Sequence, residues 1–287
     1  MLRLLAVHAH PDDESSKGAG TYAYYRSLGV DVLVVTCTGG EAGDVQNPSL
    51  DPVTLARAER DMAGLRRTEM AAAQAAMGIR HRWLGYEDSG LPEQGEAVHP
   101  NSFARIPLEH SGAPMVRIVR EFRPHVLVTY DESGGYPHPD HIRAHELALW
   151  TVDAAADAAL LPALGAPWQV SKLYYDRIFN GPRATAVRDA LDADHPMRTT
   201  LDEIVGWMGD RPDASTTRVP VGDFLEIRDA ALRAHASQVP ADSAFFFWPN
   251  DVQRVAWPWE DFQLVRSLVE TELPETDLFA GIAKETA

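Results

Sequence analysis

Two short clusters of histidine and carboxylate residues each follow an apolar run in this chain. The first, at residues 8–14, reads H-A-H-P-D-D-E and comes directly after the run at residues 2–7. The second, at residues 138–141, reads H-P-D-H and follows the run at residues 126–130. Imidazole nitrogen and carboxylate oxygen are common ligands of a catalytic metal ion, which keeps one position open for water. The clusters therefore predict a hydrolytic metal site.

Such a site needs about three protein ligands and an acceptor for a proton. The first cluster can supply one histidine and one aspartate, and the second can supply another histidine. The bound metal lowers the pKa of its water to about 7, which generates hydroxide at neutral pH. Asp12 and Asp13 can divide the remaining work, one binding the metal while its neighbour accepts the proton. The metal, together with His138 or the Tyr136 hydroxyl, can stabilise the oxyanion formed from an amide carbonyl.

The ligand types alone leave the metal open between zinc and iron. Two histidines and one carboxylate also form the site of non-haem iron oxygenases. We favour hydrolysis, because an α/β sheet with a spare aspartate beside the ligand suits that chemistry better. His8 is expected to end its strand and face away from the metal. His145, one turn after His141, is expected to pack or support the site. Glu14 stays ambiguous, because a carboxylate in a first helical turn is favoured by the helix dipole alone.

The first 175 residues alternate between strand-like and helix-like patterns. This alternation predicts an α/β fold with a Rossmann-like, mostly parallel sheet flanked by helices. Ligands bind outside the carboxyl ends of the strands in such sheets, which is where both clusters lie. Pro114 is expected near the first turn of its helix. Strands are expected at residues 2–7, 30–36, 81–84, 125–130 and 170–175, and helices at residues 15–28, 55–77, 114–122 and 140–161.

After about residue 176 the alternation weakens. We expect residues 1–175 to form the catalytic core and residues 176–287 to form a smaller α+β portion that packs on it and shapes the substrate pocket. Helices are expected at residues 184–191, 201–208 and 224–236, with a strand at 217–221. Residues 244–262 hold three of the seven tryptophans and three consecutive phenylalanines. This segment is expected either to wall the acyl-side pocket or to form ordinary core or a subunit contact.

The charge balance of the sequence argues against some classes of binding partner. The 287 residues include 26 basic and 42 acidic ones, for a net charge of −16. This balance argues against nucleic acid or an anionic membrane surface as partner, because both select for basic patches. We see no signal peptide, no run approaching the roughly 20 apolar residues of a membrane span, and one cysteine, Cys37. The cytoplasm is the expected compartment, and the sequence leaves a homo-oligomer open.

Residues 18–23, G-A-G-T-Y-A, match the dinucleotide-binding fingerprint G-x-G-x-x-A. That fingerprint must directly follow a strand and open a helix. Here residues 8–17 intervene after the first apolar run. We expect Gly18 and Gly20 to let the first helix approach the sheet closely. A nucleotide-binding module therefore remains the least favoured alternative.

The clusters resemble the zinc-dependent N-deacetylase superfamily of LmbE and PIG-L type. The residues that carry the resemblance are A-H-P-D-D-E at 9–14 and G-Y-P-H-P-D-H at 135–141, with R-x-x-E at 66–69 and L-G at 84–85. Within the superfamily the chain is similar to the amidase branch that acts on mycothiol S-conjugates. That closer similarity rests on residues 14–19, 88–92, 122–125, 170–175, 231–238 and 278–281.

The resemblance implies metal ligands and catalytic groups. His10, Asp13 and His141 match the ligands of a zinc ion, with Fe²⁺ as the alternative. Asp12 matches the general base. Two further residues complete the implied set: His138 matches the group that helps the oxyanion or protonates the leaving amine, and Tyr136 matches a mobile tyrosine over the carbonyl.

The resemblance also implies substrate-binding residues. Arg66 and Asp88 match residues that hold the sugar–inositol part of the substrate. Lys17 matches a lysine characteristic of the amidase branch. Asp44 stands where the family often has glutamate, and its side chain is one methylene shorter.

These matches imply a zinc-dependent amidohydrolase. It would cleave the amide of a mycothiol S-conjugate into a mercapturic-type acid and glucosaminyl-inositol. The alternative is a deacetylase of N-acetylglucosaminyl-inositol or a related GlcNAc substrate, with the same metal chemistry. Its partner would be a small-molecule thiol–sugar conjugate, with no nucleic acid and no membrane.

Overall fold

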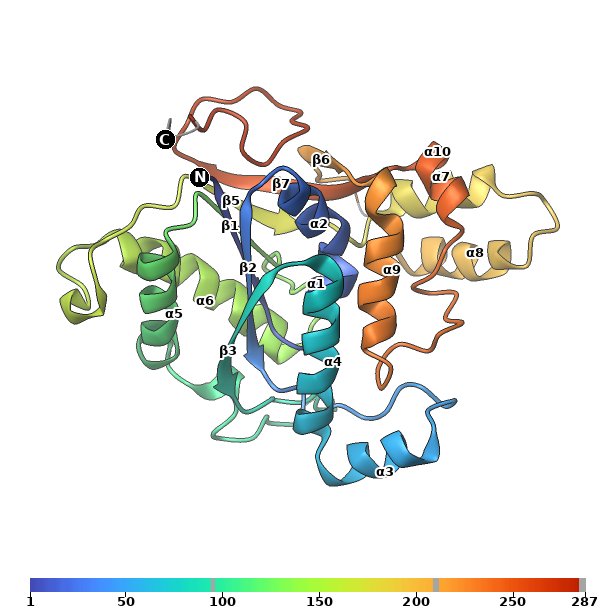
Figure 1. The fold of residues 1–287 in the computed structure, drawn as a ribbon, viewed down its shortest axis with the longest axis horizontal. Helices are drawn as coiled ribbons and strands as arrows, with labels where there is room; N and C mark the ends of the chain where they lie inside the picture. The colour runs from blue at the N-terminus through green and yellow to red at the C-terminus, as the bar shows by residue number, and fades with distance from the viewer. Residues whose placement is uncertain (94–95, 209–211, 284–287) are drawn as a thin grey trace.

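A seven-stranded mixed sheet forms the centre of the protein (Figure 1). A computed structural model describes residues 1–93, 96–208 and 212–283. In these ranges the strands follow the order β3-β2-β1-β4-β5-β7-β6 across the sheet, and β7 alone runs against the other six. The strands are β1 (Arg3–His8), β2 (Asp31–Thr38), β3 (Arg80–Tyr86), β4 (Val126–Thr129), β5 (Lys172–Asp176), β6 (Thr217–Pro220) and β7 (Trp259–Ser267). The predicted α/β class with a mostly parallel sheet is confirmed.

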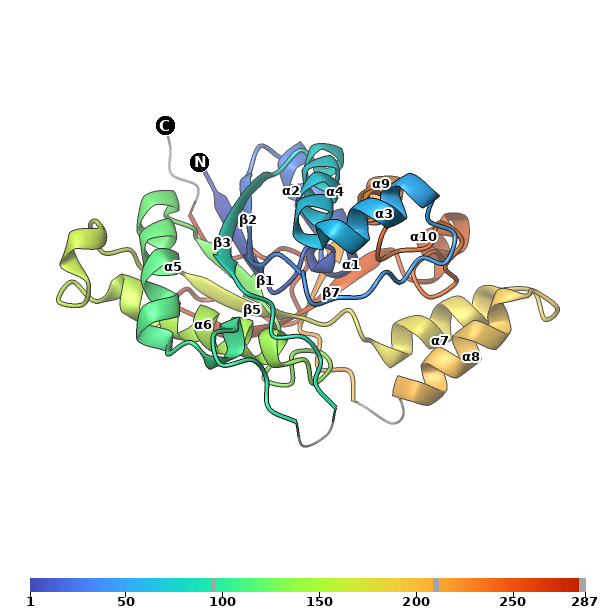
Figure 2. The ribbon, with the colours of Figure 1, turned by 90° about the horizontal axis from the view of Figure 1, so that it is seen from below.

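Helices cover both faces of this sheet (Figure 2). One face carries α5 (Leu108–Phe122) and α6 (Pro139–Ala156), and the other carries α2 (Ala19–Ser27), α4 (Met62–Met77) and α9 (Leu225–Ala234). A third apolar cluster joins α7 (Gly181–Ala190), α8 (Met197–Met208) and α10 (Asn250–Ala256) at one side of the sheet. The remaining helices are α1 (Asp13–Lys17), α3 (Pro52–Arg60), η1 (Phe103–Arg105), η2 (Pro162–Leu164) and η3 (Gly222–Phe224).

The central strands are apolar on both faces because each face has its own core. Leu5 and Val7 of β1 pack in the cluster that includes α5 and α6, whereas Leu4 and Ala6 pack in the cluster that includes α2 and α4. Successive side chains of a strand point to opposite faces, so a strand between two helical layers needs apolar residues at every position. The continuous apolar runs in the sequence reflect this double burial.

The chain changes direction across the sheet between β1 and β4. From β1 it proceeds outward to β2 and β3, and it then returns to place β4 on the other side of β1. This is a topological switch point, where the loops after two neighbouring strands diverge and leave a crevice. The two histidine–carboxylate clusters follow β1 and β4, so the fold brings them to the same crevice.

Four helix predictions need correction. The helix expected at residues 140–161 ends at Ala156 as α6. The helix expected at residues 15–28 is split at Gly18 into α1 and α2, and the one expected at 55–77 is split at Asp61 into α3 and α4. The Asp61 side chain accepts a 2.8 Å hydrogen bond from the Gly64 amide, which starts a new helix there. The placement of Pro114 near a first turn is wrong, because α5 begins at Leu108 and contains Pro114. A Cβ at Gly112 would lie 2.1 Å from the Trp150 ring. Glycine at this position therefore allows the first part of α5 to pack closely on α6.

Strand β7 was not expected. It begins inside the aromatic segment 244–262 and pairs with both β5 and β6. The C-terminal portion therefore adds two strands to the sheet of the first 175 residues, while the proposed division at residue 175 stays a prediction. The strand expected at 217–221 and the helix expected at 224–236 correspond to β6 and α9.

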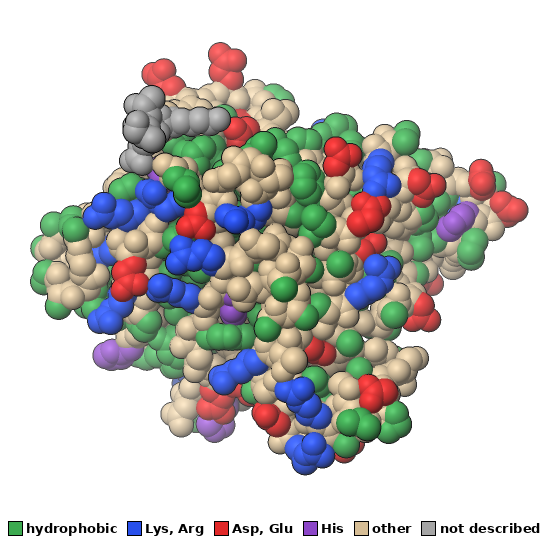
Figure 3. All heavy atoms as spheres, viewed as in Figure 1, with side chains coloured by type: hydrophobic (Ala, Val, Ile, Leu, Met, Phe, Trp, Pro, Cys, Tyr) green, Lys and Arg blue, Asp and Glu red, His purple; other side chains and the backbone are tan. Residues whose placement is uncertain are grey.

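The surface mixes charges of both signs. On the face shown in Figure 3, acidic and basic side chains are interspersed, with apolar side chains scattered among them. This face therefore presents no large patch of one sign. Among the described residues, no helix has the length and apolar character needed to cross a membrane.

Glu260 of β7 holds the N-terminus of α2. Its carboxylate accepts hydrogen bonds from the backbone amides of Gly20 at 3.1 Å and Thr21 at 2.8 Å. A Cβ on Gly20 would lie 2.9 Å from Glu260 Oε1, so glycine permits this approach of α2 to the sheet. Amides of this kind would meet a phosphate in a dinucleotide-binding fold. In this chain an internal carboxylate occupies that place.

We expect Glu260→Gln to lower the free energy of unfolding by about 1–3 kcal/mol, because an amide NH₂ replaces one oxygen and faces a buried N–H. Urea denaturation of the purified protein measures the change. The control is Glu270→Gln, which removes the same charge from an exposed residue just after β7. Equal unfolding free energies for the two variants would contradict the capping role of Glu260.

Candidate metal centre

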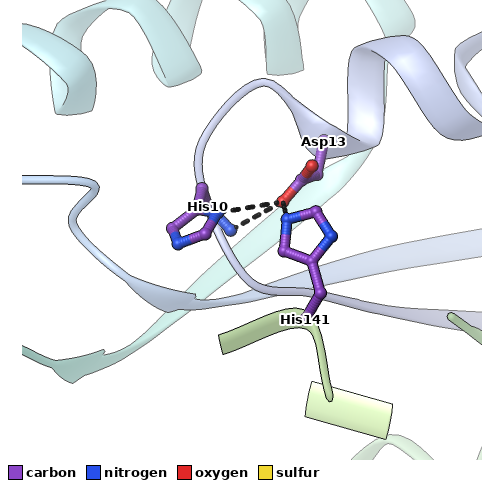
Figure 4. A group of neighbouring side chains, drawn as sticks. All are labelled: His10, Asp13 and His141. Atoms are coloured by element: carbon purple, nitrogen blue, oxygen red, sulfur yellow. Dashed lines mark hydrogen bonds and ion pairs between the residues drawn. The ribbon is translucent and has the colours of Figure 1, made fainter. Parts of the chain in front are cut away.

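Three side chains converge in the crevice beyond β1 and β4 (Figure 4). His10 and Asp13 come from the segment after β1, and His141 comes from the first turn of α6. His10 Nδ1 lies 3.5 Å from Asp13 Oδ2, and His141 Nε2 lies 3.4 Å from the same oxygen. All three side chains are buried, and one ligand atom from each lies within 4.8 Å of the others. The structure thus brings together the three residues that we predicted as metal ligands.

The orientation of His141 directs a lone pair at Asp13. Its Nδ1 donates a 2.9 Å hydrogen bond to the carbonyl of Gly134, so the neutral ring carries its proton on that nitrogen. Its Nε2 is buried and has no hydrogen-bond partner among the described residues. Gly134 has a φ of +71°, and a Cβ there would lie 2.6 Å from the Cβ of His141, so glycine alone fits beside the ring.

His10 is oriented by a carboxylate behind it. Its Nε2 lies 3.3 Å from Asp140 Oδ2 and 3.5 Å from Asp88 Oδ1. A proton on Nε2 leaves the lone pair of Nδ1 facing Asp13. Asp140 in turn accepts hydrogen bonds from the Ser89 amide, at 2.8 Å, and from the Ser89 hydroxyl. Histidines that bind metals commonly donate their second N–H to such a carboxylate.

Asp13 is held from three directions. Its Oδ1 accepts a 2.5 Å hydrogen bond from Lys17 Nζ, and its Oδ2 accepts one of 2.7 Å from the Tyr130 hydroxyl and one of 2.9 Å from the His10 amide. Burial alone would raise the pKa of Asp13, but His141 and Lys17 hold it well below its usual value. The carboxylate is therefore ionised at neutral pH.

The donor set fits a divalent cation. One nitrogen of His10 and one of His141 face the same carboxylate oxygen of Asp13, and the His141 Nε2 is left without a hydrogen-bond partner in the described ranges. Burial opposes a charge on His10, yet the carboxylates of Asp13, Asp140 and Asp88 raise its pKa well above the usual value. These surroundings favour a positive charge, and a metal ion bound by His10, Asp13 and His141 would supply it.

Asp12 occupies a strained position beside this group. It has a φ of 119°, which residues other than glycine seldom adopt and which costs on the order of 1–3 kcal/mol. The Glu14 carboxylate accepts a 3.0 Å hydrogen bond from the Asp12 amide, and Arg66 donates one of 2.9 Å to the Asp12 carboxylate. Burial raises the pKa of Asp12, and Arg66 opposes that rise. The side chain is 26% exposed and lines the adjoining cavity, so it can meet a substrate or water.

Arg66 is engaged within the protein. It is buried and donates to the carbonyl of Gly40 at 2.9 Å and to the carbonyl of Pro11, besides the Asp12 carboxylate. These contacts hold the loops after β1 and β2 together and position Asp12. The predicted contact of Arg66 with a sugar–inositol group stays a prediction.

His138 caps α6 and presents a neutral ring. Its Nδ1 accepts a 3.1 Å hydrogen bond from the Asp140 amide, which leaves the proton on Nε2. Burial, followed by the charges of His10 and His141, lowers the pKa of His138 to about 3. The His138 ring centroid lies 4.5 Å from that of His10, so its N–H is near the metal-binding group. The Tyr136 ring lies 4.7 Å from that of His141 and lines the cavity.

The other predicted substrate-binding residues lie in different surroundings. Lys17 lines the cavity while its ammonium pairs with Asp13. Asp88 is buried beside His10 and accepts hydrogen bonds from the amides of Gly90, at 2.9 Å, and Ala42, at 3.3 Å. Asp44 is exposed and lines a separate hollow next to α3, away from the residues of the cavity.

The neighbouring histidines behave as expected. His8 is fully buried, its Nε2 lies 2.8 Å from the Tyr22 hydroxyl, and burial lowers its pKa to about 4. The Nδ1 of His145 lies 3.0 Å from the carbonyl of Tyr130, so this ring packs behind the site. Neither residue belongs to the metal-binding groups found in the described ranges.

Sequence reasoning missed several supporting residues. Glu14 forms a 2.7 Å ion pair with His235, and both side chains are fully buried. That pair holds the pKa of Glu14 at about 2 although burial alone would raise it. Glu69 accepts hydrogen bonds of 2.7 Å from the amide and hydroxyl of Ser237. No local spacing signals these contacts, because their partners lie more than 160 residues apart along the chain.

A cavity of about 610 Å³ opens beside the metal-binding group. Its polar part includes Asp12, Asp13, Lys17 and Tyr136. Its other walls are mostly apolar and aromatic, and they also contain two arginines. These walls include Ile178, Phe179, Arg183, Ile204, Trp207, Met208, Arg228, Leu232, Val239, Phe245, Phe246 and Trp248. Three residues of the aromatic segment 244–262 therefore line this cavity.

Comparison with known proteins agrees with this fold and site. Residues 5–152 match the model of the family described as GlcNAc-PI de-N-acetylase (PIG-L), and this range contains both clusters. The chain belongs to this family. Its relatives are amidases and deacetylases, so the protein is an amide hydrolase of that class.

Two curated relatives match nearly the whole chain. The chain is 47% identical to a mycothiol S-conjugate amidase of Streptomyces coelicolor, covering 98% of this chain and 97% of the relative. It is 39% identical to a 1D-myo-inositol 2-acetamido-2-deoxy-alpha-D-glucopyranoside deacetylase of Streptomyces avermitilis, with the same coverage of 98% and 97%. The N,N'-diacetylchitobiose deacetylase of Pyrococcus horikoshii shares the fold, with a TM-score of 0.61, 20% identity and coverage of 92% of this chain and 83% of that one.

We expect His141→Ala to weaken metal binding by more than the roughly 10–100-fold loss typical of outer-shell substitutions, and to lower activity in parallel. Metal content after dialysis, measured by inductively coupled plasma mass spectrometry, tests this. His145→Gln is the matched control, since it alters an imidazole one turn further along the same helix. Full metal content in His141→Ala would exclude this residue as a ligand.

Proposed function

We propose that this protein is a zinc-dependent amidase that cleaves the amide of mycothiol S-conjugates, with Fe²⁺ as the alternative metal. The products would be a mercapturic-type acid and glucosaminyl-inositol. The observation that carries this proposal is the size and lining of the cavity beside His10, Asp13 and His141. An acetyl group needs only a small pocket, whereas about 610 Å³ with aromatic walls suits a bulky S-substituted acyl group.

The relatives support the same choice. The 47% identity to the Streptomyces coelicolor amidase exceeds the 39% identity to the Streptomyces avermitilis deacetylase, at equal coverage. We therefore place the acyl part of the substrate along the aromatic walls. The sugar–inositol part would extend toward Arg66, Asp88 and Asp44, as the family resemblance implies, with Lys17 between the two parts.

We assign the reaction steps to residues that surround the metal-binding group. His10, Asp13 and His141 would hold the metal, which when bound activates water and polarises the amide carbonyl. Asp12 would take the proton of the attacking water and return it to the leaving nitrogen. Its raised pKa suits a group that accepts and then releases a proton.

His138 and Tyr136 would act on the carbonyl oxygen. Because the pKa of His138 is lowered to about 3, its ring is neutral at physiological pH and donates a hydrogen bond from Nε2. A neutral donor fixed by its contact with the Asp140 amide can stabilise an oxyanion without reorganising. The Tyr136 hydroxyl would approach the same oxygen from the cavity side.

The deacetylase remains the second candidate, because relatives at 39% identity carry that name. We expect a higher kcat/KM for a bimane-labelled mycothiol S-conjugate than for N-acetylglucosaminyl-inositol, since the acetyl group leaves most of the cavity unfilled. Both substrates are assayed with the same metal-loaded protein, by release of the free amine. A preference for the acetylated sugar would overturn the amidase assignment and leave the metal chemistry intact.

We expect Asp12→Asn to lower kcat by about 10²–10⁴-fold while metal content is unchanged, because proton transfer contributes that much. Asparagine is the suitable replacement, since it tolerates positive φ and keeps an oxygen for Arg66. Steady-state kinetics together with metal analysis tests the role. An Asp12→Asn enzyme with full activity would rule out Asp12 as the base.

A further inference from the structure

A buried arginine lines the aromatic part of the cavity, and the described residues offer it no ion pair. Arg183 of α7 is 7% exposed, and its guanidinium carbon lies 5.1 Å from the ring centroid of Trp248. One of its terminal nitrogens donates a 3.2 Å hydrogen bond to Gln253 Oε1. Its Nε is buried and lacks a hydrogen-bond partner within the described ranges. The Arg183 guanidinium therefore has N–H donors at the wall of the cavity that meet no acceptor among the described residues.

The charges near Arg183 compensate it only in part. Arg228 pairs with Asp229 at 2.7 Å and also donates a 3.0 Å hydrogen bond to Gln253 Oε1. Two guanidinium groups thus share one neutral oxygen, and no carboxylate in the described part of the chain forms an ion pair with Arg183. Burial, together with the charge of Arg228, lowers the pKa of Arg183 to about 10, although the carboxylates of Asp261 and Glu260 oppose that fall. A buried cation without a partner is costly unless a ligand completes it.

A structural arginine in this protein has different surroundings. Arg120 is also buried, and its guanidinium donates to the backbone carbonyls of residues 154, 155, 157, 160, 161 and 165. Those contacts tie α5 to the segment after α6 and use the whole fork of donors. Arg183 has one such acceptor among the described residues, and it borders open space rather than packed backbone. Among the described residues, Arg183 therefore keeps donors without an acceptor where it borders the cavity.

We propose that Arg183 and Trp248 form an anion-binding subsite for the acyl-side substituent of the substrate. The class of substrate that fits is an S-conjugate whose substituent carries an aromatic ring and, at its end, a carboxylate. The ring would lie among Phe245, Phe246 and Trp248, and the carboxylate would accept charge-assisted hydrogen bonds from Arg183. This subsite rests on the proposed function, because it assigns the acyl part of the substrate to the aromatic walls.

The test compares two ligands that differ by one carboxylate. N-acetyl-S-benzylcysteine and N-acetyl-S-(4-carboxybenzyl)cysteine both carry the carboxylate that amide cleavage releases, so their difference reports the substituent alone. Isothermal titration calorimetry on the full-length metal-loaded protein measures both affinities. We expect the carboxybenzyl acid to bind on the order of tenfold more tightly, the effect of a buried charge-assisted hydrogen bond. Equal affinity for the two acids in the wild type would overturn the proposal without any variant.

Two variants test whether Arg183 causes the preference for the carboxybenzyl acid. Arg183→Gln should abolish the preference for the carboxybenzyl acid, while its affinity for the benzyl acid stays similar. Arg188→Gln is the matched control, since it removes the same charge from the same helix at a side chain that pairs with Asp189 and Asp202 outside the cavity. Its preference should equal that of the wild type. A preference that persists in a folded Arg183→Gln, or an equal loss of affinity for both acids, would contradict the subsite.

Turnover separates this proposal from the one on which it rests. The S-benzyl and S-(4-carboxybenzyl) conjugates of mycothiol are assayed with the same enzyme, and we expect a lower KM for the second. Cleavage of both conjugates with equal KM would overturn the anion subsite and leave the amidase function standing. Cleavage of neither conjugate, with tight binding of the carboxybenzyl acid, would overturn the amidase function and leave the subsite standing.

Discussion

The approach of two imidazole nitrogens to one carboxylate oxygen is the constraint on which the site depends. The Nδ1 of His10 and the Nε2 of His141 lie 3.5 and 3.4 Å from Asp13 Oδ2. The other nitrogen of each ring contacts Asp140 or the Gly134 carbonyl, and these contacts fix the orientation of the two rings. The surrounding protein therefore maintains an electron-rich pocket for a metal ion.

The supporting contacts extend across the whole fold. The strained backbone of Asp12 is held by Glu14 and Arg66, and Glu14 is held in turn by His235 at the end of α9. A network of charges in a buried region is stable only when each member has its partner. The crevice that holds His10, Asp13 and His141 thus depends on His235, a side chain from much later in the chain. Strand β7 links the same two parts by completing the sheet.

The cavity joins residues from both parts of the chain. Its polar part lies beside His10, Asp13 and His141, and its aromatic walls come from Phe179 before α7, from Trp207 of α8 and from the segment before α10. These walls lie outside residues 5–152, the region that matches the family model. Arg183 and Arg228 add positive charge to walls that are mostly apolar, which is costly for folding.

The sequence by itself determined the alternation of strands and helices and the approach of the two histidine–carboxylate clusters, because burial on both faces and strand-end position leave local patterns; the choice of His10, Asp13 and His141 within those clusters came from the family resemblance. It did not determine β7, the helical position of Pro114, or the division of two helices at Gly18 and Asp61. Only the tertiary structure decided those, together with the Glu14–His235 pair, the place of Asp140 behind His10 and the contact of Arg183 with Gln253 at the cavity wall. These features depend on contacts between residues far apart in the chain, and no spacing within a short segment records them.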